Sequence, residues 1–259
     1  LGANRVPADA TRKIAWSGKP ELNSLPEKTF RVASFNIHGG KGTDRRLDLK
    51  RIADCLADVE PQFVGLNEVH GSQFGTRLNQ AEELGQHLKM ASLFVPTERR
   101  FWQPSFGNGL LTHVSTTSVH RLPLPCTQGK KYRTATLTSF QVDGQKVRVL
   151  SVHLDRMKDR EVQLERVFSL FCDLEKPAIL MGDLNTFPND PLLAKWLKDS
   201  DIRDAVHEGL GEADPPRRID WIFTRGLQTI KGGCVGNEAS DHPLVWAELR
   251  IPEPVESPR

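Results

Sequence analysis

Short apolar runs of strand length recur along this chain, and several of them begin or end in a polar side chain that is costly to bury. Burial of a carboxylate or an imidazole costs free energy unless the group is paired, so such residues at strand ends commonly have a function. A fold for this chain must therefore account for five polar strand ends. The polar residues concerned are Asn36, Glu68, Asp183, Asp220 and the pair Asp241-His242.

The spacing of the apolar residues predicts strands and helices that alternate at first, followed by a strand-rich middle. Helices are predicted at about 49–59, 78–88, 159–174 and 191–197, and Thr43 or Asp44 could cap the first of them. Asp143-Gly144 is a hairpin signal, and Pro191 suits the first turn of a helix. Strands are predicted at 29–37, 62–66, 109–114, 117–122, 134–142, 146–152, 178–181, 220–223, 227–234 and 244–250.

Hairpins mixed with helical crossovers favour one fold class. A purely parallel sheet does not contain hairpins, whereas two packed mixed sheets with helices on their outer faces do. We therefore predict an α/β fold of that kind. No internal linker stands out among the 259 residues, so a single domain is expected at 28–251. The polar, proline-containing residues 1–27 predict an extended N-terminal arm, and 252–259 predict a C-terminal tail.

Several protein classes are disfavoured by the sequence. The four cysteines lie far apart without metal-binding spacing, which argues against a structural zinc site. There is no apolar stretch of about 18 residues that predicts a transmembrane span, and no signal-peptide pattern. The chain begins with Leu1 rather than Met, as it would after removal of a leader, so the compartment stays open. We expect a monomer, and no protein partner can be inferred.

The charge is unevenly distributed, although the net charge is only +2. Glu98 is the only acid between positions 96 and 133, which predicts an anionic ligand, with a solvated loop face as the alternative. Within this stretch Arg99, Arg100 and Trp102 mix cations with an aromatic ring, as base-stacking sites do, although Trp102 could equally pack in the core. The basic residues of the stretch are Arg99, Arg100, Arg121, Lys130, Lys131 and Arg133.

Two of the polar strand ends suggest specific chemistry. Asp183 and Asn185 are two positions apart and share a face of an extended chain, so they could hold a water molecule; an Asx turn before Pro188 is the alternative. His242 titrates near neutral pH, and Asp220 on a neighbouring strand could fix its tautomer. Each residue alone also fits a structural role.

The polar strand ends together indicate more than any one of them. His153 ends another apolar strand and adds a second imidazole. Hard oxygen ligands for a metal, a carboxylate that activates water, and imidazoles for an anionic group are what phosphoester hydrolysis requires. The sequence therefore favours such a hydrolase.

A series of motifs in this chain resembles the endonuclease/exonuclease/phosphatase superfamily, in the family's order and from about 29 to 250. That superfamily includes pancreatic-type DNase, AP endonucleases, neutral sphingomyelinases, inositol-polyphosphate 5-phosphatases and tyrosyl-DNA phosphodiesterase. The motifs are Ser34-Phe35-Asn36-Ile37, Gly65-Leu66-Asn67-Glu68-Val69, Gly107-Asn108-Gly109-Leu110-Leu111, Ser151-Val152-His153-Leu154-Asp155, Arg160-x-x-Gln163, Gly182-Asp183-Leu184-Asn185, Arg218-Ile219-Asp220-Trp221-Ile222 and Ser240-Asp241-His242.

The resemblance implies a DNase I-like four-layer sandwich, in which two mixed β-sheets are flanked by helices and the active site lies at one edge. It implies Mg²⁺ or Mn²⁺ on Glu68, with Asn36 and Asp241 in or near the coordination sphere. Asp183 would be the base that activates water, and Asn185 would orient the water or the phosphate. Asp220 would hold His242 in place. His242 and His153 would contact the phosphate, and Asn108 would support phosphate binding.

Two positions depart from the AP endonuclease pattern. This chain has His38 where those enzymes have an acid, and His153 where they have Tyr. Both features place the chain nearer to the DNase, sphingomyelinase and phosphatase branches. A phosphodiesterase or nuclease acting on a phosphoester substrate, with nucleic acid as one candidate, is our first hypothesis. The alternatives are a phosphatase or sphingomyelinase-like hydrolase of a lipid or sugar phosphate, and a catalytically silent binding module, whose relatives lack an acid or the final His.

Overall fold

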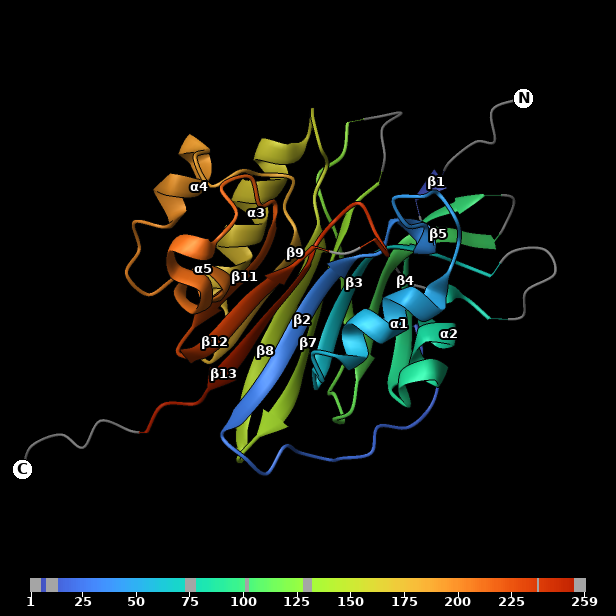
Figure 1. Cartoon of the computed structure of the whole chain (residues 1–259). Coiled ribbons are helices and arrows are strands. Elements are labelled where there is room, and N and C mark those ends of the chain that lie inside the picture. The colour runs from blue at the N-terminus through green and yellow to red at the C-terminus, as the bar shows by residue number, and fades with distance from the viewer. Residues whose placement is uncertain are drawn as a thin grey trace, which may run out of the picture.

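The computed structural model describes residues 6–7, 14–72, 78–100, 103–127, 132–236 and 238–253. Two β-sheets pack face to face in the middle of the molecule, as Figure 1 shows. The strands of the first sheet are β1 (Val6–Pro7), β2 (Thr29–Asn36), β3 (Phe63–His70), β4 (Ala91–Arg100), β5 (Gln103–Thr112), β12 (Gln228–Val235) and β13 (Leu244–Arg250). The strands of the second sheet are β6 (His120–Pro123), β7 (Thr134–Val142), β8 (Gln145–His153), β9 (Ala178–Asp183), β10 (Arg203–Asp204) and β11 (Asp220–Arg225).

Both sheets are mixed, as predicted. The seven-stranded sheet has the order β1-β4-β5-β3-β2-β13-β12, and the six-stranded sheet has the order β10-β11-β9-β8-β7-β6. In each sheet one central pair is parallel, β2 with β3 and β8 with β9, while the other named pairs are antiparallel. The carboxyl ends of the two parallel pairs therefore carry their last residues to one edge of each sheet.

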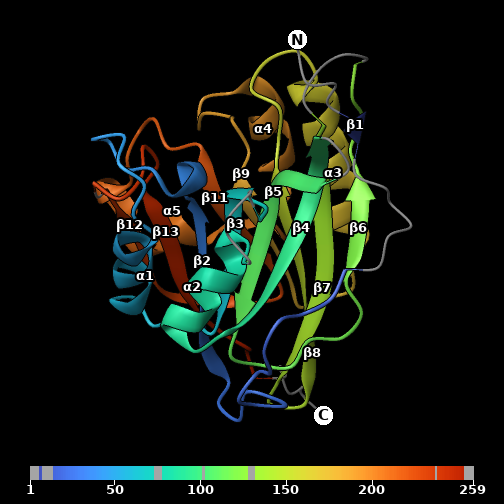
Figure 2. The ribbon, with the colours of Figure 1, turned by 90° about the vertical axis from the view of Figure 1, so that its right-hand side faces the viewer.

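Helices cover the outer faces of the two sheets (Figures 1 and 2). α1 (Leu49–Ala57) and α2 (Gln80–Leu88) pack on the seven-stranded sheet, while α3 (Arg160–Asp173) and α4 (Pro191–Trp196) pack on the six-stranded sheet. The short helix α5 (Ala205–Leu210) lies beside β12. The order helix, sheet, sheet, helix is the predicted four-layer sandwich. Among the described residues no helix is long and apolar enough to cross a membrane.

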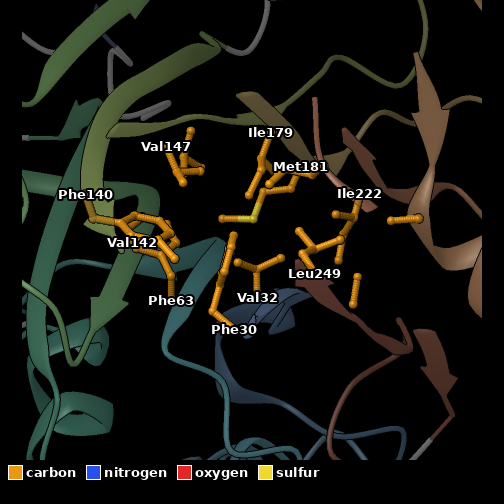
Figure 3. Close-up of a cluster of buried hydrophobic side chains, with 14 of the residues drawn as sticks. Phe30, Val32, Phe63, Phe140, Val142, Val147, Ile179, Met181, Ile222 and Leu249 are labelled. Atoms are coloured by element: carbon orange, nitrogen blue, oxygen red, sulfur yellow. The ribbon is translucent and has the colours of Figure 1, made fainter. Parts of the chain in front are cut away.

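The space between the sheets is filled by the main hydrophobic core (Figure 3). Phe30 and Phe63 from the first sheet meet Phe140 from the second, with ring centroids 5.6 and 5.3 Å from that of Phe140. Met181 and Ile222 complete the same cluster and are fully buried. Their alternation with outward-facing residues follows from the period of two in a strand. This core fixes the relation of the two sheets and hence of the residues at their common edge.

Local signals explain several element boundaries. The Asp143-Gly144 turn joins β7 to β8 with φ of 46° and 75°, which confirms the predicted hairpin. α4 begins at Pro191, as predicted, and the Asp190 side chain caps it. The predicted cap of α1 was wrong, because the Asp48 carboxylate accepts the backbone N–H groups at the helix start. Asp44 instead forms an ion pair with Arg51.

Some elements were not predicted. Strand β4 was missed because only its first half is apolar, while Pro96 and the charged residues after it argue against a strand. The two-residue strand β10 and the short helix α5 were also missed. Residues 17, 22 and 25 form isolated bridges with the strands or loops around 92, 114 and 142, so part of the predicted arm contacts the domain. The boundaries at 28 and 251 stay a prediction.

Candidate active site

The strand registers gather the predicted site residues at one edge of the sandwich. Asp183 at the end of β9 pairs with His153 at the end of β8 and with Asp220 at the start of β11. Asn36 at the end of β2 pairs with Asn67 on β3. The polar strand ends of the sequence are thus neighbours because the register of each strand is fixed by its buried apolar face.

Asp183 lies at the centre of this group and is 1% exposed. Its Oδ2 accepts a hydrogen bond from Asn36 Nδ2 at 3.1 Å, and its Oδ1 accepts one from the backbone N–H of Asn185 at 2.8 Å. His153 Nε2 lies 3.4 Å from Oδ2. Burial and the neighbouring Asp220 carboxylate raise the pKa of Asp183 to about 7, although His242 and the two hydrogen bonds counteract them in part.

Asp220 and His242 form a hydrogen-bonded pair beside Asp183. The distance from Asp220 Oδ2 to His242 Nδ1 is 2.8 Å, and His242 Nε2 lies 3.9 Å from Asp183 Oδ2. Burial alone would lower the pKa of His242, but the hydrogen bond and charge of Asp220, together with Asp183 and Asp241, raise it to about 9. The imidazole is therefore charged at neutral pH, with Nδ1–H directed to Asp220 and Nε2–H to the centre of the site.

Glu68 is suited to hold a divalent cation. A register shift between Leu66 and Val69 gives Glu68 a φ of 58°, and such bulges redirect side chains. Its carboxylate is 28% exposed, lies 3.9 Å from His153 Nε2, and receives no hydrogen bond from any residue that the structure describes. Asn36 Oδ1 accepts one backbone N–H and keeps a second lone pair. An open carboxylate beside an amide oxygen fits Mg²⁺ or Mn²⁺, which prefer oxygen ligands.

The third predicted metal ligand, Asp241, lies toward the edge of the site. Its carboxylate is 53% exposed and lies 3.5 Å from His38 Nδ1. A second group of potential ligands is formed by Asp183, Asp220 and His242, whose ligand atoms lie within 4.8 Å of one another. The site therefore offers two candidate positions for a cation, one at Glu68 and Asn36 and one in this second group.

Two residues that support the site were missed by sequence reasoning. Asn67 links the two sheets, because its Oδ1 accepts the backbone N–H of Asp183 at 3.0 Å and its Nδ2 donates to the carbonyl of Val152 at 3.0 Å. Arg133 is 5% exposed, and its Nη1 lies 3.1 Å from His153 Nδ1. Asn67 adjoins Glu68 in a motif and could have been selected, whereas Arg133 was counted only among the basic residues of the stretch that predicts an anionic ligand.

The structure describes the side chains of Asn185 and Asn108 but not those of the other remaining predicted residues. Asn185 Nδ2 donates to the carbonyl of Leu154 at 3.0 Å, which ties the loops after β8 and β9 together. Asn108 is 3% exposed, its Oδ1 accepts from Asn67 at 3.3 Å, and its Nδ2 has no partner among the described residues. A buried free donor of this kind fits a phosphate oxygen. The side chains of Arg99 and Arg100 and all of Trp102 lie outside the described part.

The two-sheet sandwich, with carboxylates, amides and histidines at one edge, defines a class of hydrolases that act on phosphoester bonds. The chain belongs to the Endonuclease/Exonuclease/phosphatase family, whose model matches residues 33–242. This membership confirms the predicted superfamily and supports a metal-dependent phosphoester hydrolase. No curated protein sequence gives a significant match.

Solved structures share the fold. An endonuclease/exonuclease/phosphatase from Beutenbergia cavernae is 25% identical, with a TM-score of 0.68, over 86% of this chain and 72% of the other. The human Nocturnin catalytic domain with bound sulfate is 16% identical, with a TM-score of 0.67, over 93% and 100%. D. rerio TDP2 complexed with a single-strand DNA product is 19% identical, with a TM-score of 0.64, over 86% and 99%. The last two show the fold alone.

Proposed function

We propose that this protein is a divalent-metal-dependent phosphodiesterase in which Asp183 activates the attacking water. The observation that carries the proposal is the buried position of Asp183 between Asn36 and His153, where its pKa is raised to about 7. A general base is most effective when its pKa lies near the working pH. An ordinary surface carboxylate is a much weaker base, so the environment of Asp183 supports this role.

The hydrogen bonds around Asp183 aim its carboxylate. Asn185 N–H holds Oδ1 and Asn36 Nδ2 holds Oδ2, while the bond from Asn67 to the Asp183 backbone fixes the end of β9. Because these donors come from both sheets, the carboxylate needs little reorganisation when it takes a proton from water.

The two histidines have different roles in the proposed mechanism. His242, charged and held by Asp220, presents Nε2–H and would stabilise negative charge that develops on the phosphoryl oxygens. Arg133 can only donate, so His153 Nδ1 must accept and the hydrogen of a neutral ring is on Nε2. His153 Nε2–H would then donate to a phosphate oxygen without taking a proton.

Mg²⁺ or Mn²⁺, when bound, would polarise the phosphoryl group and offset its charge, held by Glu68 with Asn36. Glu68, Asp183 and Asp220 supply three carboxylates, and a bound divalent cation would act with His242 and the buried Arg133 to offset their charge. The site would then accept an anionic phosphate group, and the comparison of a diester with a monoester decides between a phosphodiesterase and a phosphatase.

The proposal is tested with two chromogenic substrates, bis-p-nitrophenyl phosphate and p-nitrophenyl phosphate, in the presence of Mg²⁺ or Mn²⁺. We expect hydrolysis of the diester with a higher kcat/KM, inhibition by EDTA, and loss of turnover in Asp183→Ala. The control is Asp173→Ala, since Asp173 is exposed at the end of α3. Full activity in Asp183→Ala would refute the base, and preference for the monoester would indicate a phosphatase.

A further inference from the structure

An exposed aromatic ring lies at the rim of the site with a cation over its face. Phe187 is 43% exposed and follows Asn185 by two positions, so its Cα lies within roughly 7 Å of that of Asn185. The guanidinium carbon of Arg217 lies 5.7 Å from the centre of the Phe187 ring. Arg217 precedes Asp220 by three positions and is itself exposed. The pair thus borders the reaction centre.

The backbone that carries this pair is fixed to the site. Leu184 N–H donates to the carbonyl of Ile219 at 3.0 Å, which continues the pairing of β9 with β11 beyond Asp183 and Asp220. The indole N–H of Trp221 donates to the carbonyl of Thr186 at 3.0 Å. Phe187 is therefore held in an exposed position by its buried neighbours.

The flanking residues are held as firmly. Arg160 Nη1 donates to Thr186 Oγ1 at 3.4 Å and to Asp190 Oδ2 at 2.6 Å. Arg218, next to Arg217, is 3% exposed and bonded to Asp204 and Asp214. Arg218 also donates to the backbone carbonyl of Asp220 at 2.9 Å. The Phe187–Arg217 pair therefore keeps its place relative to the catalytic residues.

Further exposed cations surround the same edge on two other loops. The loop after β2 contacts the segment before His242 through a bond from Thr43 N–H to the carbonyl of Glu238, and the loop after β8 is tied to Asn185. The cations of these loops form no ion pair with any described carboxylate, so they remain available to bind anionic groups of a ligand. They are Lys41, Arg45, Arg156 and Lys158.

We propose that Phe187 and Arg217 form a stacking platform for an unpaired base next to the scissile phosphate, and that the cations on the rim bind flanking phosphates of a single-stranded polynucleotide. This inference rests on the proposed phosphodiesterase. Aromatic rings and guanidinium planes stack on bases, whereas bases inside a duplex do not expose their faces. The cations lie on three separate loops. They match the repeated phosphates of a polynucleotide better than the single charged head group of a lipid.

Binding tests the platform independently of turnover. Fluorescence anisotropy with a labelled 12-nucleotide oligothymidylate in EDTA is expected to give a Kd that rises roughly 10-fold in Phe187→Ala and in Arg217→Ala. Phe187→Trp should retain binding, because its ring also stacks. The matched controls are Val162→Ala and Arg166→Ala, two exposed residues on the outer face of α3, and these should bind like the wild type.

Salt and hydrolysis complete the experiment. Log Kd should rise steeply with log salt, and each of Arg156→Ala and Lys158→Ala should reduce the slope by about 1. With Mg²⁺, the ratio of kcat/KM for the oligonucleotide to that for methyl p-nitrophenyl phosphate should fall about 10-fold in Phe187→Ala.

Unchanged Kd values in both platform variants, equal binding of duplex, or preferential hydrolysis of sphingomyelin vesicles would each overturn the inference. Failure of the wild type to hydrolyse the small diester would instead refute the proposed phosphodiesterase.

Discussion

Asp220 Oδ2 lies 2.8 Å from Nδ1 of His242, and this contact joins a strand end of one sheet to a loop of the other. The loop that carries His242 is in turn fixed to β2, because Ser240 Oγ donates to the carbonyl of Asn36 at 2.7 Å. The site is therefore assembled across the interface of the two sheets, and it depends on the packing between them. A charged His242 faces Asp183 as a consequence.

Asp220→Asn should reduce kcat by about 100-fold or more, the scale of losing a charge-stabilising donor. Without the carboxylate the pKa of His242, now raised to about 9, falls toward its ordinary value, and the ring is neutral in more of the working range. The measurement is the pH profile of kcat/KM for bis-p-nitrophenyl phosphate. Its alkaline limb should shift to lower pH. An unshifted limb with wild-type kcat would show that the pair has no catalytic role.

The contributions of Asp183 and His242 to stability should fall as the pH rises, because the pKa values of both groups are raised in the folded protein. A native state that binds more protons than the unfolded state is most stable at low pH. The contribution of Asp183 to stability is present below the pKa of 3.8 in the unfolded chain, and it is lost as the pH rises through about 7. The contribution of His242 is present below the pKa of 6.5 in the unfolded chain, and it is lost as the pH rises through about 9.

Asp183→Asn tests this dependence. The variant should lose the decline in unfolding free energy between pH 4 and 7, a change on the order of a few kcal/mol. It should keep most of the decline due to His242, because Asp220 raises the pKa of His242 more than Asp183 does. Urea unfolding in EDTA at several pH values measures the difference, with Asp173→Asn as the exposed control. Identical curves for Asp183→Asn and the wild type would mean that burial does not raise the pKa of this carboxyl.

The parts of the site that depend on local sequence could be predicted, while those that depend on cross-sheet contacts could not. Asp183 ends an apolar run, His242 precedes one, and both lie in recognisable motifs, so they were selected as candidates from the sequence. Arg133 is a site residue only because its side chain is buried behind His153, and no local pattern separates it from the cations around it. Asn67 likewise acquires its role from a bond to the opposite sheet.

The same distinction holds for the fold. The hairpin at Asp143-Gly144 and the strand at 244–250 were predicted because turn chemistry and alternation are local signals. Strand β4 was missed, since its second half is polar and forms a strand by pairing with β5 and β1. The bulge that gives Glu68 its φ of 58° also depends on pairing with β5 and could not be read from the sequence.

Glu68→Gln should remove metal-dependent stabilisation. In EDTA the unfolding free energy should fall by only about 1 kcal/mol, because the carboxylate receives no hydrogen bond from the described residues and only its charge acts on the buried Arg133. The rise in Tm that Mg²⁺ or Mn²⁺ causes in the wild type should be lost. Urea unfolding in EDTA measures the free energy, and differential scanning fluorimetry measures the rise in Tm. Glu161→Gln, on the exposed face of α3, should keep the metal-induced rise. An equal rise in Glu68→Gln would place the metal elsewhere, with Asp183, Asp220 and His242 as the next candidate ligands.

Arg133→Gln and Arg133→Lys should separate the two contributions of the buried guanidinium. Burial lowers the pKa of Arg133 while Glu68 and Asp183 raise it in part, so the charge is held among carboxylates. Its removal in the Gln variant should cost about 3 kcal/mol of unfolding free energy, as the loss of one partner of a buried charge group does. The Lys variant keeps the charge but not the planar contact with His153 Nδ1, so it should recover much of the stability and little of the lost kcat.

Nitrogen-15 NMR of the His153 ring should show Nδ1 as the acceptor only in the wild type, and Arg166→Lys serves as the surface control. Wild-type kcat in Arg133→Lys would show that Arg133 does not orient His153.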